Sequence, residues 1–289
     1  MNDPVAVDPH PLDPGLYIVA TPIGNLGDLS ARATDWLRRA DLIACEDTRV
    51  TAKILSRIGS HRPMLAFHDH SPEAQRETLL ARMAQESVAL VSDAGTPLIS
   101  DPGHELVRDA RARGISVTTA PGPCAAIAAL SIAGLPANRF FFQGFLPAKA
   151  QARDRAIEAL VAVPGTLLFH ETGPRLGATL AALHRTLGNR EAAMARELTK
   201  LHEEVDRGRL ADLAARYRDV APRGEIVLVV GPRADDAEGP ASAEEVDEAL
   251  RRALASLPAG KAAASVAAAF GLPRADMFRR ALALQGQKP

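Results

Sequence analysis

The sequence predicts an α/β fold of two α/β domains, followed by a small helical C-terminal region. Short apolar runs alternate with amphipathic stretches along most of the chain, a pattern typical of alternating strands and helices. A segment punctuated by proline and glycine at about 121–136 divides this alternation into two sets. The chain has 289 residues, of which 47% are hydrophobic, so it can bury a sizeable core.

The first set of elements predicts a largely parallel sheet, because strands that alternate with helices usually pair in parallel. Helices are expected near 29–39, 50–58, 72–86 and 103–113. Strands are expected at Leu16–Ala20, Asp41–Cys45, Met64–Phe67, Val88–Val91 and Ile115–Thr119.

The second set begins after Pro123 with a helix of small residues, CAAIAALSIAG. Further helices are expected near 149–161 and 175–187. The expected domains are a disordered leader (1–14), an N-terminal α/β domain (15–122), a C-terminal α/β domain (123–233), and an acidic linker with a basic helical tail (234–289). Strands of the second set are expected at Phe140–Phe145, Thr166–His170, Ala192–Arg196 and Glu225–Val230.

Composition excludes several classes of protein. Cys45 and Cys124 lie far apart, which argues against a disulfide framework and a cysteine-rich zinc site. The acidic, proline-rich opening MNDPVAVDPHPLDPG lacks the basic start and apolar run of a signal peptide. No stretch approaches the roughly 18 apolar residues of a membrane span. We therefore expect a cytoplasmic protein.

The near-neutral net charge of −1 hides a segregation of charge in the tail. Residues 235–249 contain acids and no Lys or Arg, whereas residues 250–289 contain bases and one acid, Asp276. The segment from Lys261 to Ala283 is predicted to form two helices broken at Gly271–Pro273, somewhat like a helix-turn-helix. A basic surface of this kind can bind phosphate chains. The alternative is a packed helical cap whose bases are simply solvated.

Each unusual motif of the first set follows a predicted strand. They are TPIGNLGDLS (21–30), EDTR (46–49), HDHS (68–71), SDAGTPLISDPG (92–103) and APGP (120–123). In a parallel sheet these positions share the carboxyl edge, where ligands bind. Asp93, Thr96, Ser100 and Asp101 offer acceptors for ribose hydroxyls or an amino group. The chain contains neither a G-x-x-x-x-G-K-[ST] phosphate loop nor a G-x-G-x-x-G fingerprint, which disfavours an ordinary dinucleotide fold.

Two further motifs have competing interpretations. His68 and His70 in HDHS could chelate a metal, but no third cluster of ligands accompanies them, so we expect no metal site and favour a loop that contacts a partner molecule. Cys124 is interpreted as part of a binding wall rather than as a nucleophile, because no histidine follows nearby to activate it.

Several long segments resemble those of the ribosomal RNA small-subunit methyltransferase I family, within the tetrapyrrole-methylase-like superfamily. The segments are LYIVATPIGNLGDLS, DLIACEDTR, LVSDAGTPLISDPG, APGPCAAIAALSIAGLP, FFFQGFLPAK and ARELTK, between Leu16 and Pro232. The resemblance implies S-adenosylmethionine bound in a cleft between the two α/β domains. It further implies methylation of a cytidine ribose 2′-hydroxyl in the decoding region of 16S rRNA, on free RNA or on the assembled small subunit, by a homodimer.

The resemblance also implies a set of cofactor-binding residues in five segments. The loop after the first strand lies near the reaction centre, the loop after the fourth strand holds the methionine and ribose portions, and the start of the small-residue helix forms the adenine-side wall. This chain has His170-Glu171-Thr172 where family members often have tyrosine, glutamate and serine. The residues are Pro22, Ile23, Gly24, Asn25, Ser92, Asp93, Ala94, Gly95, Thr96, Pro97, Ile99, Pro121, Cys124, Ala125, Ala126, His170, Glu171 and Leu198.

The reaction requires help with removal of the hydroxyl proton. Glu46, Glu197 and Lys200 are the candidate catalytic residues, and we hypothesise that Glu46 or Lys200 assists the proton transfer. The alternative interpretation of Glu46-Asp47-Thr48-Arg49 is an ordinary helix start with Asp47 or Thr48 as its cap. Candidate contacts to RNA are Arg49, His68, His70, Lys149 and Arg196, and the alternative interpretation of Lys149 is a solvated helix start.

Two other functions fit the same pattern. One is methylation of a tetrapyrrole or a protein side chain by an enzyme of the same superfamily. The other is a non-catalytic ribosome-binding protein that keeps the cofactor pocket. The motifs EDTR and HDHS and the basic tail favour the RNA methyltransferase, because the alternatives give them no clear purpose.

Overall fold

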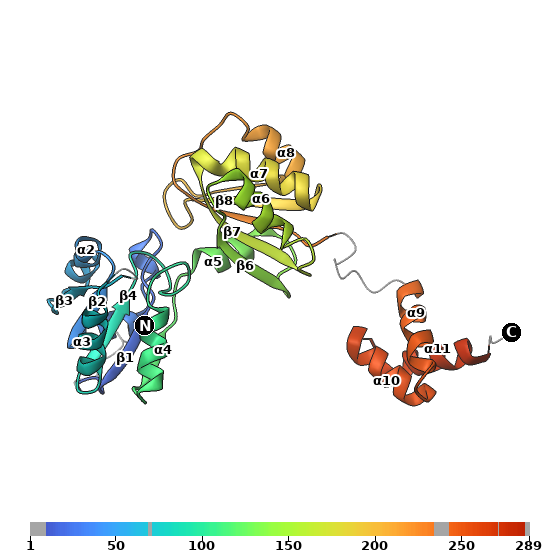
Figure 1. Ribbon diagram of the computed structural model, residues 1–289, viewed down its shortest axis with the longest axis horizontal. Coiled ribbons are helices and arrows are strands. Elements are labelled where there is room, and N and C mark those ends of the chain that lie inside the picture. Colours follow the sequence, from blue (N-terminus) through green and yellow to red (C-terminus); the bar gives the residue numbers. More distant parts are fainter. Residues whose placement is uncertain (1–9, 69–70, 234–242, 271, 287–289) are drawn as a thin grey trace, which may run out of the picture. The chain divides into compact units, whose positions relative to one another are not determined.

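The computed structural model describes residues 10–68, 71–233, 243–270 and 272–286. The chain divides into two compact units, residues 1–233 and 234–289. The first unit contains two five-stranded sheets, and helices form the second (Figure 1). We refer to the parts of the first unit that surround the first and second sheets as its N-terminal and C-terminal halves.

The first sheet is entirely parallel, in the order β3-β2-β4-β1-β5. Its central strands β1, β2 and β4 are buried at every position, as expected for a parallel sheet covered on both faces. This confirms the predicted α/β class. The strands are β1 (Gly15–Val19), β2 (Leu42–Cys45), β3 (Met64–Ala66), β4 (Ser87–Val91) and β5 (Val117–Ala120).

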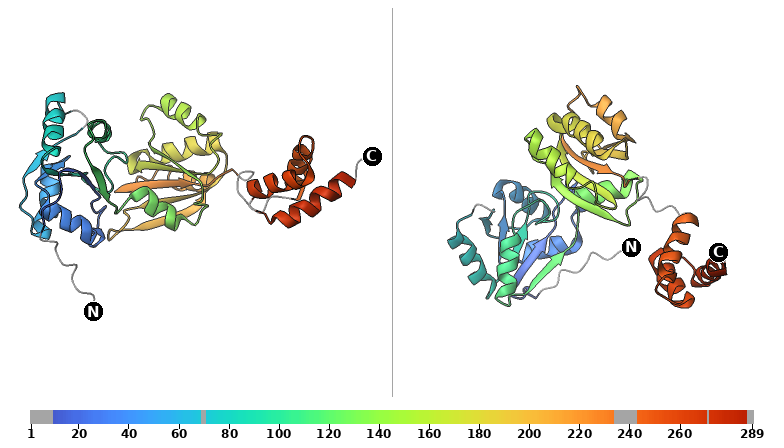
Figure 2. Two further views of the ribbon diagram at one scale, coloured as in Figure 1. Left: turned by 90° about the horizontal axis from the view of Figure 1, so that it is seen from below. Right: turned by 45° about the vertical axis from the view of Figure 1, so that its right-hand side comes forward.

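Helices cover both faces of the first sheet (Figure 1 and Figure 2). Leu37 and Leu55 pack against the inward side chains of one face, and Leu80 and Leu106 against those of the other. The side chain of Ser30 caps the first helix by accepting the Ala33 N–H at 3.1 Å. The helices are α1 (Ala31–Arg39) and α2 (Thr48–Ile58) on one face, and α3 (Glu73–Met83) and α4 (His104–Ala112) on the other.

The second sheet is mixed, in the order β6-β7-β10-β8-β9. Strands β6 and β7 pair in parallel, and the other pairs are antiparallel. Helix α5 (Ala125–Ala133) covers one face with small side chains such as Ala126 and Ala129, while α6, α7 and α8 cover the other. The bounds are β6 (Phe140–Phe145), α6 (Ala150–Glu158), β7 (Thr166–Thr172), α7 (Gly173–Leu187), β8 (Glu191–Arg196), β9 (Glu204–Arg209), α8 (Leu210–Arg216) and β10 (Glu225–Val230).

The second unit has its own small core, in which Val246, Leu250, Val266 and Met277 are buried. Its helices are α9 (Ala243–Leu254), α10 (Ala259–Phe270) and α11 (Arg274–Gly286). The last two match the predicted pair of helices. The acids and bases that segregate along the sequence meet here, because Arg280 forms an ion pair with Asp247 at 2.5 Å.

Strand β9 and helices α8 and α9 were not predicted. Strand β9 contains one apolar residue, Val205, and lies at the edge of its sheet, so it lacks the apolar signal of a buried strand. Helix α9 begins within the acidic segment, where only charge was noted. Residues 1–9 of the expected leader lie outside the described residues, and within 10–14 the backbone carbonyl of Asp13 accepts the Tyr17 hydroxyl at 2.9 Å.

The helices of the described residues were also compared with the requirements of a membrane span. None of them combines the length and the apolar character needed to cross a bilayer.

Candidate active site

The loops that follow the strands of the first sheet converge at its carboxyl edge. Thr21 and Gly95 form a two-way backbone bridge, with N···O distances of 2.9 and 3.1 Å, between the loops after β1 and β4. The Asp47 N–H donates to the Asp93 carboxylate at 3.0 Å, which ties the loop after β2 to the same place. The Thr96 hydroxyl donates to the Pro123 carbonyl at 2.9 Å and adds the loop after β5. Four of the five predicted motifs therefore meet at this edge, all except HDHS after β3.

A cavity of about 380 Å³ opens at this edge. Both halves of the first unit line it: the loops after β1, β2 and β4 and the start of α5 on one side, and strands β6, β7 and β10 on the other. A cavity of this size suits a small organic ligand. The lining residues are Ile23, Glu46, Asp93, Ala94, Ile99, Ser100, Asp101, Ala125, Phe145, His170, Glu171, Thr172, Gly224, Glu225, Ile226 and Val227.

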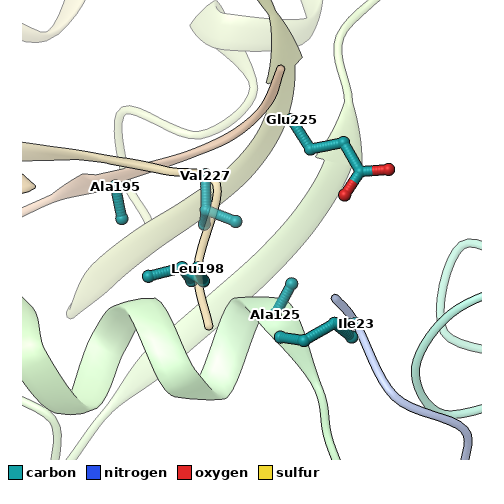
Figure 3. Close-up of a pocket in the computed structure, with 6 residues that line it drawn as sticks. All are labelled: Ile23, Ala125, Ala195, Leu198, Glu225 and Val227. Carbon is teal, nitrogen blue, oxygen red and sulfur yellow. The ribbon is translucent and has the colours of Figure 1, made fainter. Parts of the chain in front are cut away.

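A smaller pocket of about 20 Å³ shares four residues with this cavity. Ile23, from the loop after β1, and Ala125, at the start of α5, lie opposite Glu225 and Val227 of β10 (Figure 3). Leu198, which was predicted to bind the cofactor, closes this pocket together with Ala195. Small and aliphatic side chains thus form an apolar wall beside the carboxylates of the edge.

Three of the lining carboxylates influence one another. Burial, opposed by a hydrogen bond with Ser92 and reinforced by the charges of Glu46 and Asp93, raises the pKa of Asp101 to about 6. Asp101 is half-buried, whereas Glu46 is exposed at the end of β2. A carboxylate whose pKa lies close to neutrality can gain and lose a proton under working conditions.

Lys200 and Glu197 form an ion-paired network with Glu225 rather than standing alone. The Lys200 ammonium lies 2.9 Å from Glu197 Oε1 and 3.0 Å from Glu225 Oε2. Burial lowers the pKa of Lys200, but the hydrogen bonds to these two carboxylates outweigh it and the net pKa is raised. Lys200 therefore carries a positive charge at neutral pH beside the apolar wall.

The pKa of Glu197 moves in the opposite direction. Its hydrogen bonds from Lys200 and from the Glu225 N–H, the latter at 3.0 Å, lower that pKa. Two glycines lie against this ion-paired network. A Cβ on Gly24 would lie 2.4 Å from Lys200 Cγ, and a Cβ on Gly224 would lie 2.4 Å from Glu197 Oε1. Because glycine has no side chain, the loop after β1 and the segment before β10 can both lie close to Lys200 and Glu197.

The Glu171 side chain lines the cavity, but hydrogen bonds and an ion pair with its neighbours hold it in place. It is 2% exposed, accepts hydrogen bonds from the Thr179 hydroxyl at 2.5 Å and the Thr172 N–H at 2.8 Å, and lies 3.2 Å from Arg175 Nε. Arg175 also donates to the Leu146 carbonyl. These contacts hold the carboxyl end of β7 to the first turns of α7.

His170, the neighbour of Glu171, lies between two aromatic rings of β6. Its ring centroid is 5.0 Å from that of Phe142 and 5.3 Å from that of Phe145. Burial lowers the pKa of His170, so the ring is neutral at neutral pH. Its buried Nε2 has no hydrogen-bond partner among the described residues, which leaves a polar atom for a ligand.

The residues predicted to contact RNA lie on different parts of the first unit. Arg49 is exposed and forms an ion pair with Asp47 at 2.5 Å, and Arg196 pairs with Glu204 at 2.7 Å. The side chain of Asp47 accepts the Arg49 N–H at 2.8 Å, so the expected cap of α2 is present. Lys149, directly before α6, and His68 are exposed, and His70 lies outside the described residues.

Not every predicted cofactor-binding residue lines the cavity. Ile23, Asp93, Ala94, Ile99, Ala125, His170 and Glu171 do. Asn25 instead caps a short 3₁₀ turn at Leu26–Asp28, where its side chain accepts the Gly27 N–H at 2.9 Å. Pro22, Gly24, Ser92, Gly95, Thr96, Pro97, Pro121, Cys124 and Ala126 belong to the surrounding loops and the start of α5.

Of the residues that the second sheet contributes to the cavity, only His170 and Glu171 were predicted as site residues. The others that line it are Phe145, Thr172, Gly224, Glu225, Ile226 and Val227. The available signal was weak: Phe145 ends a strand, and Gly224 directly precedes one. Among the described residues, no group of three or more His, Cys, Asp and Glu side chains is arranged to hold a metal ion.

Comparisons with families of known proteins match almost the whole chain. Residues 15–214 match the family of tetrapyrrole (corrin/porphyrin) methylases, and residues 240–285 match the RsmI C-terminal HTH domain. A protein of Erythrobacter litoralis, named ribosomal RNA small subunit methyltransferase I, is 54% identical and covers 96% of this chain and 97% of its own length. The protein of the same name from Escherichia coli O157:H7 is 46% identical, with 94% and 96% covered.

Solved structures support the same fold at lower identity. A diphthine synthase is 17% identical, covers 75% of this chain and 89% of its own, and has a TM-score of 0.58. Uroporphyrin-III C-methyltransferase from Thermus thermophilus, complexed with S-adenosylhomocysteine, is 21% identical, covers 75% and 97%, and has a TM-score of 0.51. Each similarity covers a length of chain close to that of the two-sheet unit, and it shows the fold alone.

Proposed function

Since this chain belongs to the ribosomal RNA small subunit methyltransferase I family, we propose that it methylates the ribose 2′-hydroxyl of a cytidine in the decoding region of 16S rRNA. The chain is an S-adenosylmethionine-dependent methyltransferase acting on ribosomal RNA. The observation that carries the finer proposal is the cavity of about 380 Å³, which the motif loops of the first sheet and the ends of the second sheet enclose together. We retain 15–122 and 123–233 as the proposed domains.

The residues present fit the cofactor. Ala94 and Ala125 leave room for a flat ring, and the unpartnered Nε2 of the neutral His170 offers one polar contact. Asp93 offers a carboxylate to hydroxyl or amino groups. The bound cofactor supplies a methyl group on a positively charged sulfur, which is intrinsically reactive. The predicted cofactor-binding residues remain our proposal for its site.

The remaining tasks fall to the side chains around the cavity. They must align the acceptor oxygen with the methyl group, exclude water and manage one proton. The ammonium of Lys200, held by Glu197 and Glu225, places positive charge beside the site, where it favours an oxygen that becomes negative. Glu46 adds a negative charge at the end of β2. We propose that Arg49, Arg196, Lys149, His68 and His70 contact RNA.

The proposal includes a cytoplasmic homodimer. Exposed apolar side chains on α5 and β6 support self-association: Ile127 and Ile132 are 44% and 45% exposed, and Phe140 and Phe145 are 46% and 52% exposed. Analytical ultracentrifugation of the full chain tests this part, and a monomer at micromolar concentration would contradict it.

A methyl-transfer assay tests the function. Purified protein and tritiated S-adenosylmethionine are incubated with small ribosomal subunits, with free 16S rRNA and with a corrin precursor. We expect label in ribosomal RNA, with the assembled subunit as the better substrate, because the near-neutral net charge gives the chain little general affinity for free RNA. Label in the corrin precursor alone, or no transfer to any acceptor, would contradict the proposal.

A further inference from the structure

Asp101 lies on the wall of the cavity, on the segment that runs from β4 to α4. It lines the cavity together with Glu46, which follows β2, and Asp93, which follows β4. Asp101 is half-buried, so its side chain faces the cavity from within the structure rather than from open solvent. Asp47 caps a helix, and Glu171 and Glu197 form ion pairs. These contacts explain the roles of those three carboxylates, but they do not explain the role of Asp101.

The backbone around Asp101 is held in an uncommon conformation. Leu98 and Ser100 have φ values of 73° and 65°, in the left-handed region that residues with a side chain seldom adopt. The segment is anchored before them by the Thr21–Gly95 bridge and after them by Gly103, where a Cβ would lie 2.9 Å from Leu90 Cδ2. Backbone strain of this kind persists where the surroundings impose it, and it is common at active sites.

Ser100, directly before Asp101, lies against the second sheet. The Ser100 Oγ would lie 3.1 Å from a Cβ at Gly144, the glycine at the β-bulge of β6, where φ is 72°. The bulge therefore leaves room for the loop that carries Asp101 to approach β6. This close approach brings the loop that carries Asp101 next to the second sheet, and Asp101 itself lines the cavity.

The other candidate bases are less suited to accept a proton. Lys200 is protonated at neutral pH, because its ion pairs with Glu197 and Glu225 raise its pKa above the ordinary value. Glu197 is engaged by Lys200, and that hydrogen bond lowers its pKa. A useful base combines access to the substrate with a pKa near the operating pH. Burial and neighbouring charge bring the pKa of Asp101 to about 6, which meets the second condition.

We propose that Asp101 accepts the proton of the methyl-acceptor hydroxyl, and that Glu46 assists by keeping the surroundings of Asp101 negative. The assignment rests on the proposed function. In the step, the acceptor oxygen forms a bond to the methyl carbon, and the carbon–sulfur bond breaks with its electron pair left on sulfur. The hydroxyl proton passes to the Asp101 carboxylate and then to solvent. Charge balances because a sulfonium becomes a neutral thioether while the carboxylate becomes neutral.

The first test is the single-turnover methylation rate of Asp101→Asn with small subunits at saturating S-adenosylmethionine, from pH 5 to 9. The wild-type rate should rise through a titration near pH 6 and then level off, following the pKa of Asp101. The variant should be slower by about 10²-fold and lack this titration, while calorimetry shows cofactor affinity within about threefold of wild type. Asp219→Asn, which removes an exposed carboxylate outside the cavity, is the matched control and should behave as wild type.

The second test measures the carboxyl itself without turnover. Carbon-13 NMR of the free enzyme should show a carboxyl titrating near pH 6 that is missing from Asp101→Asn. Glu46→Gln should move that titration to lower pH and move the rise of the wild-type rate profile with it, because one negative neighbour is removed. Asp101→Glu should recover part of the lost rate.

Three results would overturn the assignment. They are a rate for Asp101→Asn within about threefold of wild type, a titration of the rate near pH 6 that persists in this variant, or cofactor affinity weakened more than about tenfold with a normal rate at saturation. The last would make Asp101 a cofactor ligand. Failure of wild type to label RNA would instead reject the proposed function, and the assignment with it.

Discussion

Asp101 derives its unusual titration from neighbours that are distant in the sequence. Burial, reinforced by the charges of Glu46 and Asp93, raises its pKa to about 6. The sequence predicted Glu46 as catalytic and noted Asp101 only as a polar acceptor, because burial and neighbouring charge are properties of the folded chain. Phe145 and Val227 were missed for a related reason: an apolar strand residue that lines a cavity has the same sequence signal as one in the core.

The raised pKa has a consequence for stability. A carboxyl whose folded-state pKa lies above its unfolded value stabilises the fold at low pH, and this contribution is lost as pH rises from about 4 to about 6. Asp101→Asn removes the ionisation, so its melting temperature relative to wild type should increase from pH 4.5 to pH 7.5 by about 2–4 °C. Differential scanning calorimetry checks this. A difference that stays constant with pH would show that the folded-state pKa of Asp101 is ordinary.

Arg49 provides a second prediction at the residue scale. Its side chain is exposed and forms an ion pair with Asp47, and an exposed ion pair of this kind contributes little to stability. Arg49→Ala should therefore leave the melting temperature almost unchanged, weaken binding to small ribosomal subunits and reduce the salt dependence of that binding by about one charge. Filter-binding titrations over a range of salt concentrations check this. Arg218→Ala, which removes another exposed arginine, is the control, and an equal loss in both variants would exclude a specific role for Arg49.

At the scale of elements, apolar periodicity predicted most strands to within two residues. Strands β6 and β10 have the expected bounds, and β7 extends two residues beyond Thr166–His170. The mixed pairing of the second sheet could not be predicted, because strand order depends on contacts between residues far apart in the chain. The predicted loops of the first sheet were recognisable because each follows a strand and contains glycine, proline or charged residues.

Helix α7 is placed by a glycine at its first residue. A Cβ at Gly173 would lie 1.7 Å from the Pro222 carbonyl oxygen, a backbone atom that cannot move aside easily. Gly173→Ala should lower the free energy of unfolding by about 1–3 kcal/mol or more and disturb the nearby Thr172 on the cavity wall. Urea denaturation and cofactor titration check the two effects.

The matched control for this change is Gly260→Ala in α10, where the nearest atom would lie 3.9 Å from the new Cβ. That substitution should leave the free energy of unfolding unchanged or raise it by less than about 1 kcal/mol. If the two variants are equally stable, Gly173 and Pro222 lie farther apart in solution than they do in the structure.

At the scale of the whole molecule, the chain divides its tasks between two units. The cavity lies in residues 1–233, whereas residues 234–289 have a separate core and match a C-terminal HTH domain. The sequence predicted the two last helices from the break at Gly271–Pro273, but it could not show that acids and bases of this unit pair with each other, as Asp247 and Arg280 do. Part of the basic charge is therefore neutralised within the unit.

Removal of residues 234–289 tests this division. The shortened chain should bind S-adenosylmethionine with nearly unchanged affinity, because every residue that lines the cavity remains. Its methylation of small subunits should fall by about tenfold or more if the second unit contributes contacts to RNA. Calorimetry and the tritium assay measure the two quantities, and full methylation by the shortened chain would assign the second unit a different role.

The central claim is methyl transfer to a ribose hydroxyl of ribosomal RNA, and the position of the transferred methyl tests it most directly. Small subunits that lack the modification are treated with the enzyme and deuterium-labelled S-adenosylmethionine, and the RNA is digested to nucleosides for mass spectrometry. We predict that the label appears in 2′-O-methylcytidine from the decoding region. Label on a base, on another nucleoside, or on a ribosomal protein would contradict the account.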